Sequence, residues 1–196
     1  MLHEPSPVTE ALLRLRPSSA SADEEIAVET PVALTVNGVS QAVMLATPAD
    51  LEDFALGFGL AEGWFTSRRD LLDLEIESQP QGLELALTVT AACEQRLKAR
   101  RRTLAGRTGC GLCGVDSLTE LAAVQPQPVQ APQLAAGALD RALAALPAVQ
   151  VLTARCGGLH SAAWCRPDGE LLLAREDIGR HNALDKLIGA LAQRDT

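Results

Sequence analysis

Two cysteines three positions apart are the residues of this 196-residue sequence best suited to chemistry. Cys110 and Cys113 lie in the run Gly-Cys-Gly-Leu-Cys-Gly, where residues without side chains let another protein approach both thiols closely. A cysteine attacks as a thiolate, yet an ordinary thiol with a pKa of about 8.5 is only a few per cent ionised at neutral pH. The pair therefore suggests nucleophilic thiol chemistry, provided that its surroundings favour the thiolate.

A run of basic residues directly before the cysteines could provide the positive charge that favours the thiolate. Its members are Arg96, Lys98, Arg100, Arg101, Arg102 and Arg107. Positive charge near a thiol lowers its pKa, and a depression of about 1.5 units would leave it nearly half ionised at pH 7. The run would also attract an anionic cofactor or an acidic partner. Its plainer interpretation is a solvated helix face.

The C-x-x-C spacing leaves three interpretations open. A cysteine that carries sulfur as a persulfide is the first, with the second thiol resolving or sharing that sulfur. A zinc site is the second, completed by His160 and either Cys156 or Cys165. A thioredoxin-like dithiol is the third, but that motif needs a strand before it and a helix starting at it, whereas a basic helix precedes this pair.

A second polar cluster lies near the end of the sequence. His160 follows the turn Gly157-Gly158, and Arg180 and His181 lie directly before the last predicted helix. Free N–H groups and the helix dipole favour an anion at such a position, so His160, Arg180 and His181 are weak candidates for binding a phosphate or pyrophosphate. Helix capping, by His181 or Asn182, and ion pairing are the structural alternatives. Cys93, Cys156 and Cys165 are interpreted as small core residues.

The elements that must position these residues begin after a Ser-, Pro- and Ala-rich start. Residues 1–25 predict a mobile arm with at most a short helical patch at 11–15. Residues 26–92 predict an α+β subdomain: a hairpin turns at Asn37-Gly38, a helix capped by Thr47 follows, and a second pair of strands ends near residue 89. The basic helix, the C-x-x-C loop and a Pro/Gln linker occupy residues 93–132.

Residues 133–196 predict a second subdomain of α/β character. We expect a helix over 133–146, a short strand over 149–153, a hairpin that turns at Pro167-Asp168-Gly169, and a helix over 182–192. The last helix has an apolar face, and an α/β pattern would normally place another strand after it.

Composition narrows the possible functions. The formal net charge is −8, aromatic residues make up 3%, and no apolar run could cross a bilayer. We therefore expect no nucleic-acid partner, no membrane association and a cytoplasmic location. In a reducing cytosol, a C-x-x-C pair favours catalysis or metal binding over a structural disulfide.

Several motifs resemble the formate dehydrogenase accessory sulfurtransferase family, FdhD. They are Gly-Arg-Thr-Gly-Cys110-Gly-Leu-Cys113-Gly after Arg-Arg-Arg, the run Arg-Glu-Asp-Ile-Gly-Arg-His-Asn-Ala-Leu-Asp-Lys-Leu-Ile-Gly that ends at Gly189, and Asp50-Leu-Glu-Asp-Phe-Ala-Leu-Gly-Phe. The resemblance implies a sulfurtransferase that moves a persulfide sulfur from a cysteine desulfurase to the molybdenum cofactor, in its bis-molybdopterin guanine dinucleotide form, for formate dehydrogenase. It also implies a homodimer with a cytidine-deaminase-like fold.

The family's persulfide-bearing cysteine falls on Cys110 and its assisting thiol on Cys113. The resemblance implies only transient contact with the molybdenum cofactor, with no metal and no tightly bound cofactor of the protein's own. Family members continue beyond the last motif with a segment that contacts the guanine nucleotide, whereas this sequence stops at Thr196. We therefore expect an incomplete cytidine-deaminase-like unit over 133–196. A zinc-stapled binding module and an inactive remnant of the family are the alternatives.

Overall fold

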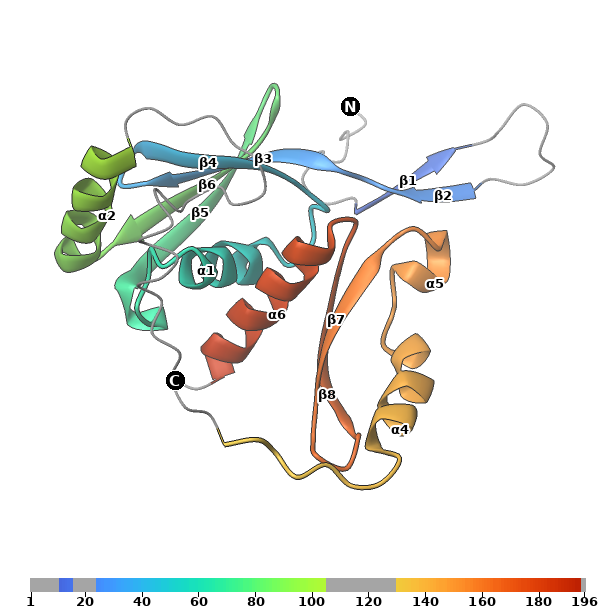
Figure 1. The fold of residues 1–196 in the computed structure, drawn as a ribbon. Helices are drawn as coiled ribbons and strands as arrows, with labels where there is room; N and C mark the ends of the chain where they lie inside the picture. The colour runs from blue at the N-terminus through green and yellow to red at the C-terminus, as the bar shows by residue number, and fades with distance from the viewer. Residues whose placement is uncertain (1–10, 16–23, 105–129, 195–196) are drawn as a thin grey trace.

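A four-stranded mixed sheet forms the first layer of the computed structural model, which describes residues 11–15, 24–104 and 130–194. The strand order is β4-β3-β6-β5, in which β3 runs antiparallel to β4 and parallel to β6, and β5 runs antiparallel to β6 (Figure 1). The strands are β3 (Thr30–Val36), β4 (Val39–Ala46), β5 (Leu71–Gln79) and β6 (Gly82–Val89).

Local sequence explains the β3–β4 hairpin and the burial pattern of β6. Asn37 and Gly38 have φ angles of 46° and 76°, the left-handed conformation that a tight turn requires, so the predicted hairpin is confirmed. Strand β6 alternates between buried and less buried residues, and its buried Leu83, Leu85 and Leu87 face the core.

Helix α1 (Leu51–Ala61) covers one face of this sheet and completes its core (Figure 1). Phe54 is fully buried, and Phe58 packs on Phe54 and edge-on against Trp64. The predicted cap at Thr47 is wrong, because the helix begins at Leu51 after Asp50, which has a φ of 52°. Thr47 is fully buried and bonds to a distant part of the chain.

The remaining described elements follow residue 130. They are α4 (Ala138–Ala145), η2 (Leu146–Ala148), α5 (Thr153–Cys156), β7 (His160–Cys165), β8 (Leu171–Asp177) and α6 (Arg180–Arg194). The predicted hairpin of β7 and β8 and the last helix are confirmed. The strand expected over 149–153 is wrong, since a turn and α5 occupy that stretch, and α4 is shorter than the helix expected over 133–146.

Helix α6 lies between α1 and the β7–β8 hairpin, so it joins the two parts of the chain (Figure 1). Its contact with α1 is unusually close. A Cβ added at Gly57 would lie 1.7 Å from the carbonyl oxygen of Asp185, and one at Gly189 would lie 1.9 Å from that of Asp53. The two helices therefore meet backbone to backbone, which only glycine permits.

A short hairpin of β1 (Leu12–Leu15) and β2 (Glu24–Ala27) precedes the main sheet. The helical patch expected at 11–15 is therefore wrong. Arg155 of α5 donates two hydrogen bonds to the Glu25 carboxylate of β2, from Nε at 2.7 Å and from Nη2 at 2.6 Å. These bonds tie the hairpin to α5. With its three separate sheets among the described residues, the structure is a mixed α+β fold. None of the described helices is long and apolar enough to cross a membrane.

Candidate functional site

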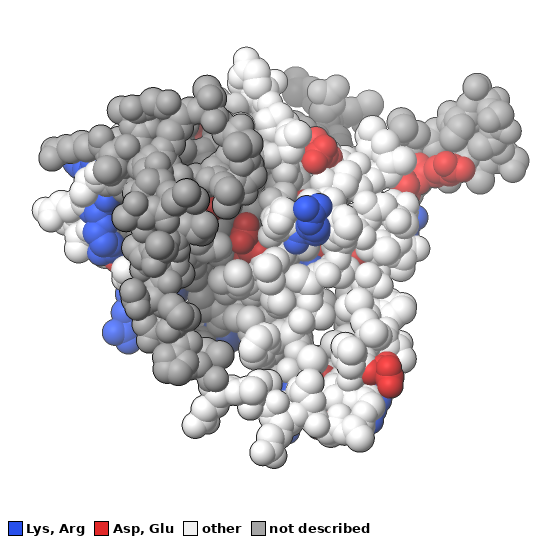
Figure 2. Space-filling view, viewed as in Figure 1, with Lys and Arg blue, Asp and Glu red and all other residues white. Residues whose placement is uncertain are grey.

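The two predicted reactive thiols, Cys110 and Cys113, fall in residues 105–129 and so lie outside the described residues. The helix expected before them is confirmed as α2 (Ala91–Leu104). Thr90 precedes it, and the Thr90 hydroxyl accepts a hydrogen bond from the backbone N–H of Cys93 at 3.3 Å. Cys93 and Leu97 are buried in the core, whereas Arg96 and Lys98 are exposed. In Figure 2, Lys and Arg side chains gather at the left edge, where α2 lies.

Asp70 holds the beginning of α2. Its carboxylate accepts hydrogen bonds from the backbone N–H and the hydroxyl of Thr66, the hydroxyl of Thr90 and the guanidinium of Arg96, at 2.7 to 3.1 Å. Burial acts to raise the pKa of Asp70, but these hydrogen bonds outweigh it and hold the pKa well below its usual range. The carboxylate is therefore charged and fully engaged at neutral pH.

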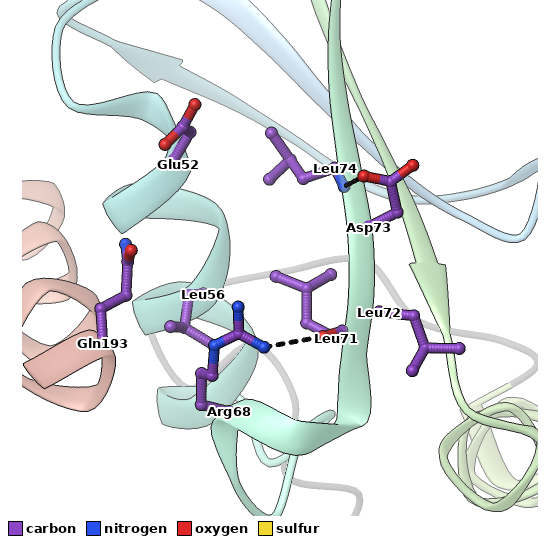
Figure 3. Close-up of a pocket in the computed structure, with 8 residues that line it drawn as sticks. All are labelled: Glu52, Leu56, Arg68, Leu71, Leu72, Asp73, Leu74 and Gln193. Carbon is purple, nitrogen blue, oxygen red and sulfur yellow. Dashed lines mark hydrogen bonds between the residues drawn. The ribbon is translucent and has the colours of Figure 1, made fainter. Parts of the chain in front are cut away.

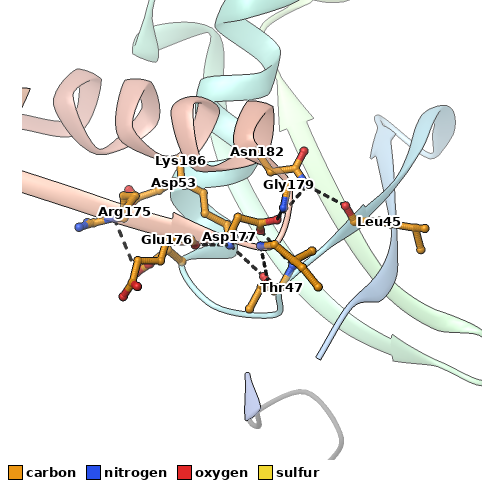
Figure 4. A network of polar contacts seen from close by, with 11 residues as sticks. Leu45, Thr47, Asp53, Arg175, Glu176, Asp177, Gly179, Asn182 and Lys186 are labelled. Atoms are coloured by element: carbon orange, nitrogen blue, oxygen red, sulfur yellow. Dashed lines mark hydrogen bonds and ion pairs between the residues drawn. The ribbon is translucent and has the colours of Figure 1, made fainter. Parts of the chain in front are cut away.

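A second cluster is built around a buried ion pair between α6 and the end of β8 (Figure 4). Lys186 and Asp177 are both 0% exposed, and their Nζ and Oδ2 atoms are 2.7 Å apart. The Lys186 ammonium also donates to the backbone carbonyls of Thr47 and Glu176. Burial lowers the pKa of Lys186, and the attraction of Asp177 opposes that shift.

Asp177 also organises the backbone around it. Its carboxylate accepts hydrogen bonds from the backbone N–H groups of Thr47 and Gly179, at 2.9 and 2.8 Å. The Asn182 amide donates to Asp177 and to the carbonyl of Leu45. Asn182 and His181 lie inside α6, so the prediction that either of them caps this helix is wrong.

Glu176 and Arg175 extend the cluster in two directions. The Glu176 carboxylate accepts from the backbone N–H groups of Leu152 and Thr153 and from the Thr153 hydroxyl, which holds the first turn of α5. Arg175 donates to Asp53 of α1 at 2.7 Å. Every buried side-chain nitrogen and oxygen of the described residues has a hydrogen-bond partner, so the cluster fixes elements in place rather than presenting a free reactive group.

Sequence reasoning missed the buried roles of Thr47, Asp177 and Lys186. One signal was present: Lys186 shares the spacing of Ala183, Leu187 and Ala190, the buried positions of α6. A lysine on the buried face of a helix requires a carboxylate partner, but nothing in the local sequence identifies which of the 25 acidic residues provides it.

The three weak candidates for anion binding lie near one another in the topology. His160 is the first residue of β7 and pairs with Asp177 of β8, while Arg180 and His181 are the first two residues of α6. All three residues are exposed. The structure therefore places them at one end of the unit formed by β7, β8 and α6, and an anion site there stays a prediction.

The zinc interpretation also stays open, because two of its ligands, Cys110 and Cys113, lie outside the described residues. Its other candidates are described: His160 and Cys165 are exposed, and Cys156 is half-buried and bonds through its sulfur to the Leu152 carbonyl. Within residues 11–15, 24–104 and 130–194, no three His, Cys, Asp or Glu side chains are grouped to hold a metal ion.

Two neighbouring cavities lie between α1, β5 and the end of α6. The first has a volume of about 230 Å³, and Figure 3 shows Glu52 and Leu56 of α1 facing Leu71 and Leu74 of β5 across it. The second, of about 340 Å³, shares Glu52 and Gln193 with it. No sequence pattern identifies these cavities, because three elements far apart in the chain line them.

Comparisons with known proteins relate this chain to one family. The sequence model described as the FdhD/NarQ family matches residues 27–196. The sulfur carrier protein FdhD of Variovorax paradoxus is 54% identical over 168 residues, which are 86% of this chain and 60% of that protein. The FdhD of Cupriavidus necator is 52% identical over 170 residues, 86% of this chain and 59% of that protein. The chain thus spans about 60% of the length of these relatives.

A solved structure supports the fold. The crystal structure of a protein described as a formate dehydrogenase accessory protein, from Desulfotalea psychrophila, aligns with a TM-score of 0.58 at 21% identity. The alignment covers 94% of this chain and 66% of that one. At that identity, the similarity shows a shared fold.

Proposed function

Because this chain belongs to the FdhD/NarQ family, we propose that it is a sulfur carrier in which Cys110 holds sulfur as a persulfide and Cys113 assists. The observation that supports this most strongly is the Cys-Gly-Leu-Cys motif, which follows a basic helix in a chain about half identical to proteins named as sulfur carriers. Positive charge on α2 favours the thiolate that sulfur uptake requires.

Loading is a thiol–persulfide exchange. The Cys110 thiolate attacks the outer sulfur of a persulfide on a cysteine desulfurase, the donor's S–S bond breaks, and the donor cysteine leaves as a thiolate. Cys110 then carries the transferred sulfur with its proton, and no net oxidation occurs. For release, the Cys113 thiolate attacks the inner sulfur of this persulfide, which frees hydrosulfide and leaves a Cys110–Cys113 disulfide. A cellular dithiol then reduces that disulfide.

The acceptor that we propose is the molybdenum cofactor in its bis-molybdopterin guanine dinucleotide form, on its way to formate dehydrogenase. The name of the solved relative, an accessory protein of formate dehydrogenase, supports formate dehydrogenase as the partner. His160, Arg180 and His181 are candidates to contact the anionic cofactor transiently, since they share one end of the β7–β8–α6 unit. We further propose that residues 133–196 belong to a cytidine-deaminase-like α/β unit and that the protein acts as a homodimer.

Sulfur loading provides the direct test. The protein is incubated with a cysteine desulfurase and cysteine, and intact mass is measured before and after addition of a reductant. We expect one reducible sulfur atom on the wild type and none on Cys110→Ala. Cys165→Ala is the matched control, because Cys165 is an exposed thiol outside the motif, and it should load normally.

Two results would overturn the proposal. The first is sulfur that still binds when Cys110 is replaced. The second is a stoichiometric zinc ion that is lost in Cys113→Ala, which would favour the zinc-stapled module instead.

A further inference from the structure

Strand β5 forms one edge of the main sheet. Among the described residues it pairs only with β6, so its other edge, the free edge, carries no strand. The backbone N–H of Leu74 donates to the carboxylate of the preceding Asp73 at 2.9 Å, and the carbonyl of Leu87, the partner of Leu74 on β6, accepts from the β3–β4 turn. Leu74 therefore points its backbone groups away from β6. Because these directions repeat at every second residue of a strand, Ile76 and Ser78 also present their backbone groups at the free edge.

The two cavities between α1, β5 and α6 lie beside this free edge. Leu74 points across the first cavity toward Glu52 and Leu56 of α1 (Figure 3). Ile76 lines the second cavity. Since side chains alternate between the two faces of a sheet, a strand added to the free edge would place every second side chain over these cavities. Their volumes of about 230 and 340 Å³, and the leucine, isoleucine and proline side chains in their walls, suit aliphatic side chains.

The opposite face of β5 is acidic. Asp73, Glu75 and Glu77 lie on it, and all three are exposed. Glu77 pairs directly with Glu84 of β6, so two like charges face each other across the ladder. Within the described part of the chain, no cation pairs with Glu75 or Glu77. The remaining side chains of an added strand would lie beside these carboxylates, where lysine or arginine is the complementary residue.

The charge distribution decides which occupant fits. Two copies of β5 paired edge to edge would bring their acidic faces together, and the chain as a whole has a net charge of −8, so a second copy is disfavoured. We propose that the free edge of β5 binds an extended segment of a partner protein in which aliphatic residues alternate with lysine or arginine. The segment joins the main sheet as a fifth strand, with its aliphatic side chains over the cavities and its cations beside Glu75 and Glu77. This proposal does not depend on the sulfur chemistry.

A synthetic peptide of alternating valine and lysine, about seven residues long and blocked at both ends, tests the site. Its valines would lie opposite Leu74 and Ile76 and exchange backbone hydrogen bonds with them. Calorimetric titration at about 0.15 M salt, which screens distant charges, should give a dissociation constant below about 1 mM. Two control peptides should bind at least about tenfold more weakly. One replaces the valines by proline, which keeps the charge but removes the donors, and the other replaces lysine by glutamate.

Amide hydrogen exchange locates the bound peptide. In the free protein, the N–H groups of Ile76 and Ser78 should exchange rapidly, because they have no strand partner. At saturation with the valine–lysine peptide, their exchange should slow by about fivefold or more. The amides of β4, at the other edge of the main sheet, should exchange as before.

Substitutions in β5 separate a specific site from attraction to an acidic protein. Glu75→Gln combined with Glu77→Gln should raise the dissociation constant about fivefold, since two exposed ion pairs are lost. Asp140→Asn combined with Glu170→Gln is the matched control, because it removes two exposed charges from α4 and the β7–β8 turn and should leave binding within about twofold. Ser78→Pro removes one donor at an edge position that tolerates proline, and it should weaken binding about fivefold.

Each measurement has an outcome that contradicts the proposal. Slow exchange of the Ile76 and Ser78 amides in the free protein would show that the edge is already occupied. Equal binding of the proline peptide, or equal weakening by the two double variants, would show attraction by net charge alone. A valine–lysine peptide that does not bind at about 1 mM would also rule the site out.

Discussion

Replacement of Gly57 by alanine tests the backbone contact between α1 and α6. The new methyl carbon would lie 1.7 Å from the carbonyl oxygen of Asp185, whereas ordinary contact begins at 3.4 Å. A backbone carbonyl inside a helix cannot rotate away, so the helices must separate by about 1.7 Å, the difference between these two distances. That separation would loosen the packing of Ala183, Leu187 and Ala190, which are buried on α6.

The magnitude follows from two opposing effects. Overpacking of a well-filled interface typically costs about 1–3 kcal/mol, and more where only backbone can move. Alanine is favoured over glycine inside a helix by about 1 kcal/mol, which offsets part of that cost. Because only backbone can move here, we take a gross cost of about 3–5 kcal/mol, above the typical range. After the offset of about 1 kcal/mol, the net loss in the free energy of unfolding is about 2–4 kcal/mol, a large fraction of the total of about 5–15 kcal/mol for a typical domain.

Urea unfolding followed by tryptophan fluorescence measures this loss, because Trp64 is buried against Phe58 in the main core. Gly59→Ala is the matched comparison in the same helix. Its methyl would meet the ring of Phe65, at 2.2 Å, and a side chain can turn aside where a carbonyl cannot. We expect Gly59→Ala to cost less than Gly57→Ala. A Gly57→Ala protein that is as stable as the wild type would refute the close-packing argument.

Two further predictions concern the charged groups of α6. Lys186→Met should lower the free energy of unfolding by about 3–5 kcal/mol, measured by urea denaturation, since it leaves the Asp177 carboxylate buried without its cation; a loss below about 1 kcal/mol would contradict this. Burial, with repulsion from Glu62 adding to it, raises the pKa of Asp185 to about 6. The folded protein therefore binds a proton that the unfolded chain releases, so the contribution of Asp185 to stability is full below about pH 4 and is lost as the pH rises through 6. Asp185→Asn should thus stabilise the protein by about 1–3 kcal/mol at pH 7.5 and leave it unchanged at pH 4, and equal effects at both pH values would count against it.

Sequence reasoning succeeded where a few adjacent residues determine the backbone. Asn37-Gly38 and Pro167-Asp168-Gly169 identify their hairpins because turn residues tolerate conformations that others avoid. The alternation of Leu83, Leu85 and Leu87 similarly identifies β6, since side chains of a strand point to opposite faces. The C-x-x-C motif and the family motifs were also recognisable, because their spacing is itself the signal.

Sequence reasoning failed where a contact joins residues that are far apart in the chain. Thr47 has the right residue type for a helix cap, but its hydroxyl accepts from the backbone N–H of Ile178, 131 residues away. The stretch 149–153 is apolar enough for a strand, yet Leu152 and Thr153 turn their backbone N–H groups to Glu176. Neither of these distant hydrogen-bond partners can be identified from the neighbouring residues in the sequence. The buried pair of Lys186 and Asp177 was missed for a similar reason, since burial depends on the packing of whole elements.

The glycine contact between α1 and α6 also bears on how the chain reaches its native state during synthesis. Gly57 and Gly189 are 132 positions apart in the sequence, so a ribosome working at about 5–20 residues per second needs roughly 7–26 s between them. Throughout that interval the face of α1 that α6 will cover stays exposed to solvent, together with the unpaired carbonyl of Thr47. Contacts between residues so far apart in the sequence also form slowly. The nascent chain therefore presents an uncovered apolar helix face for seconds before α6 is synthesised, and during that time this face can associate with other apolar surfaces.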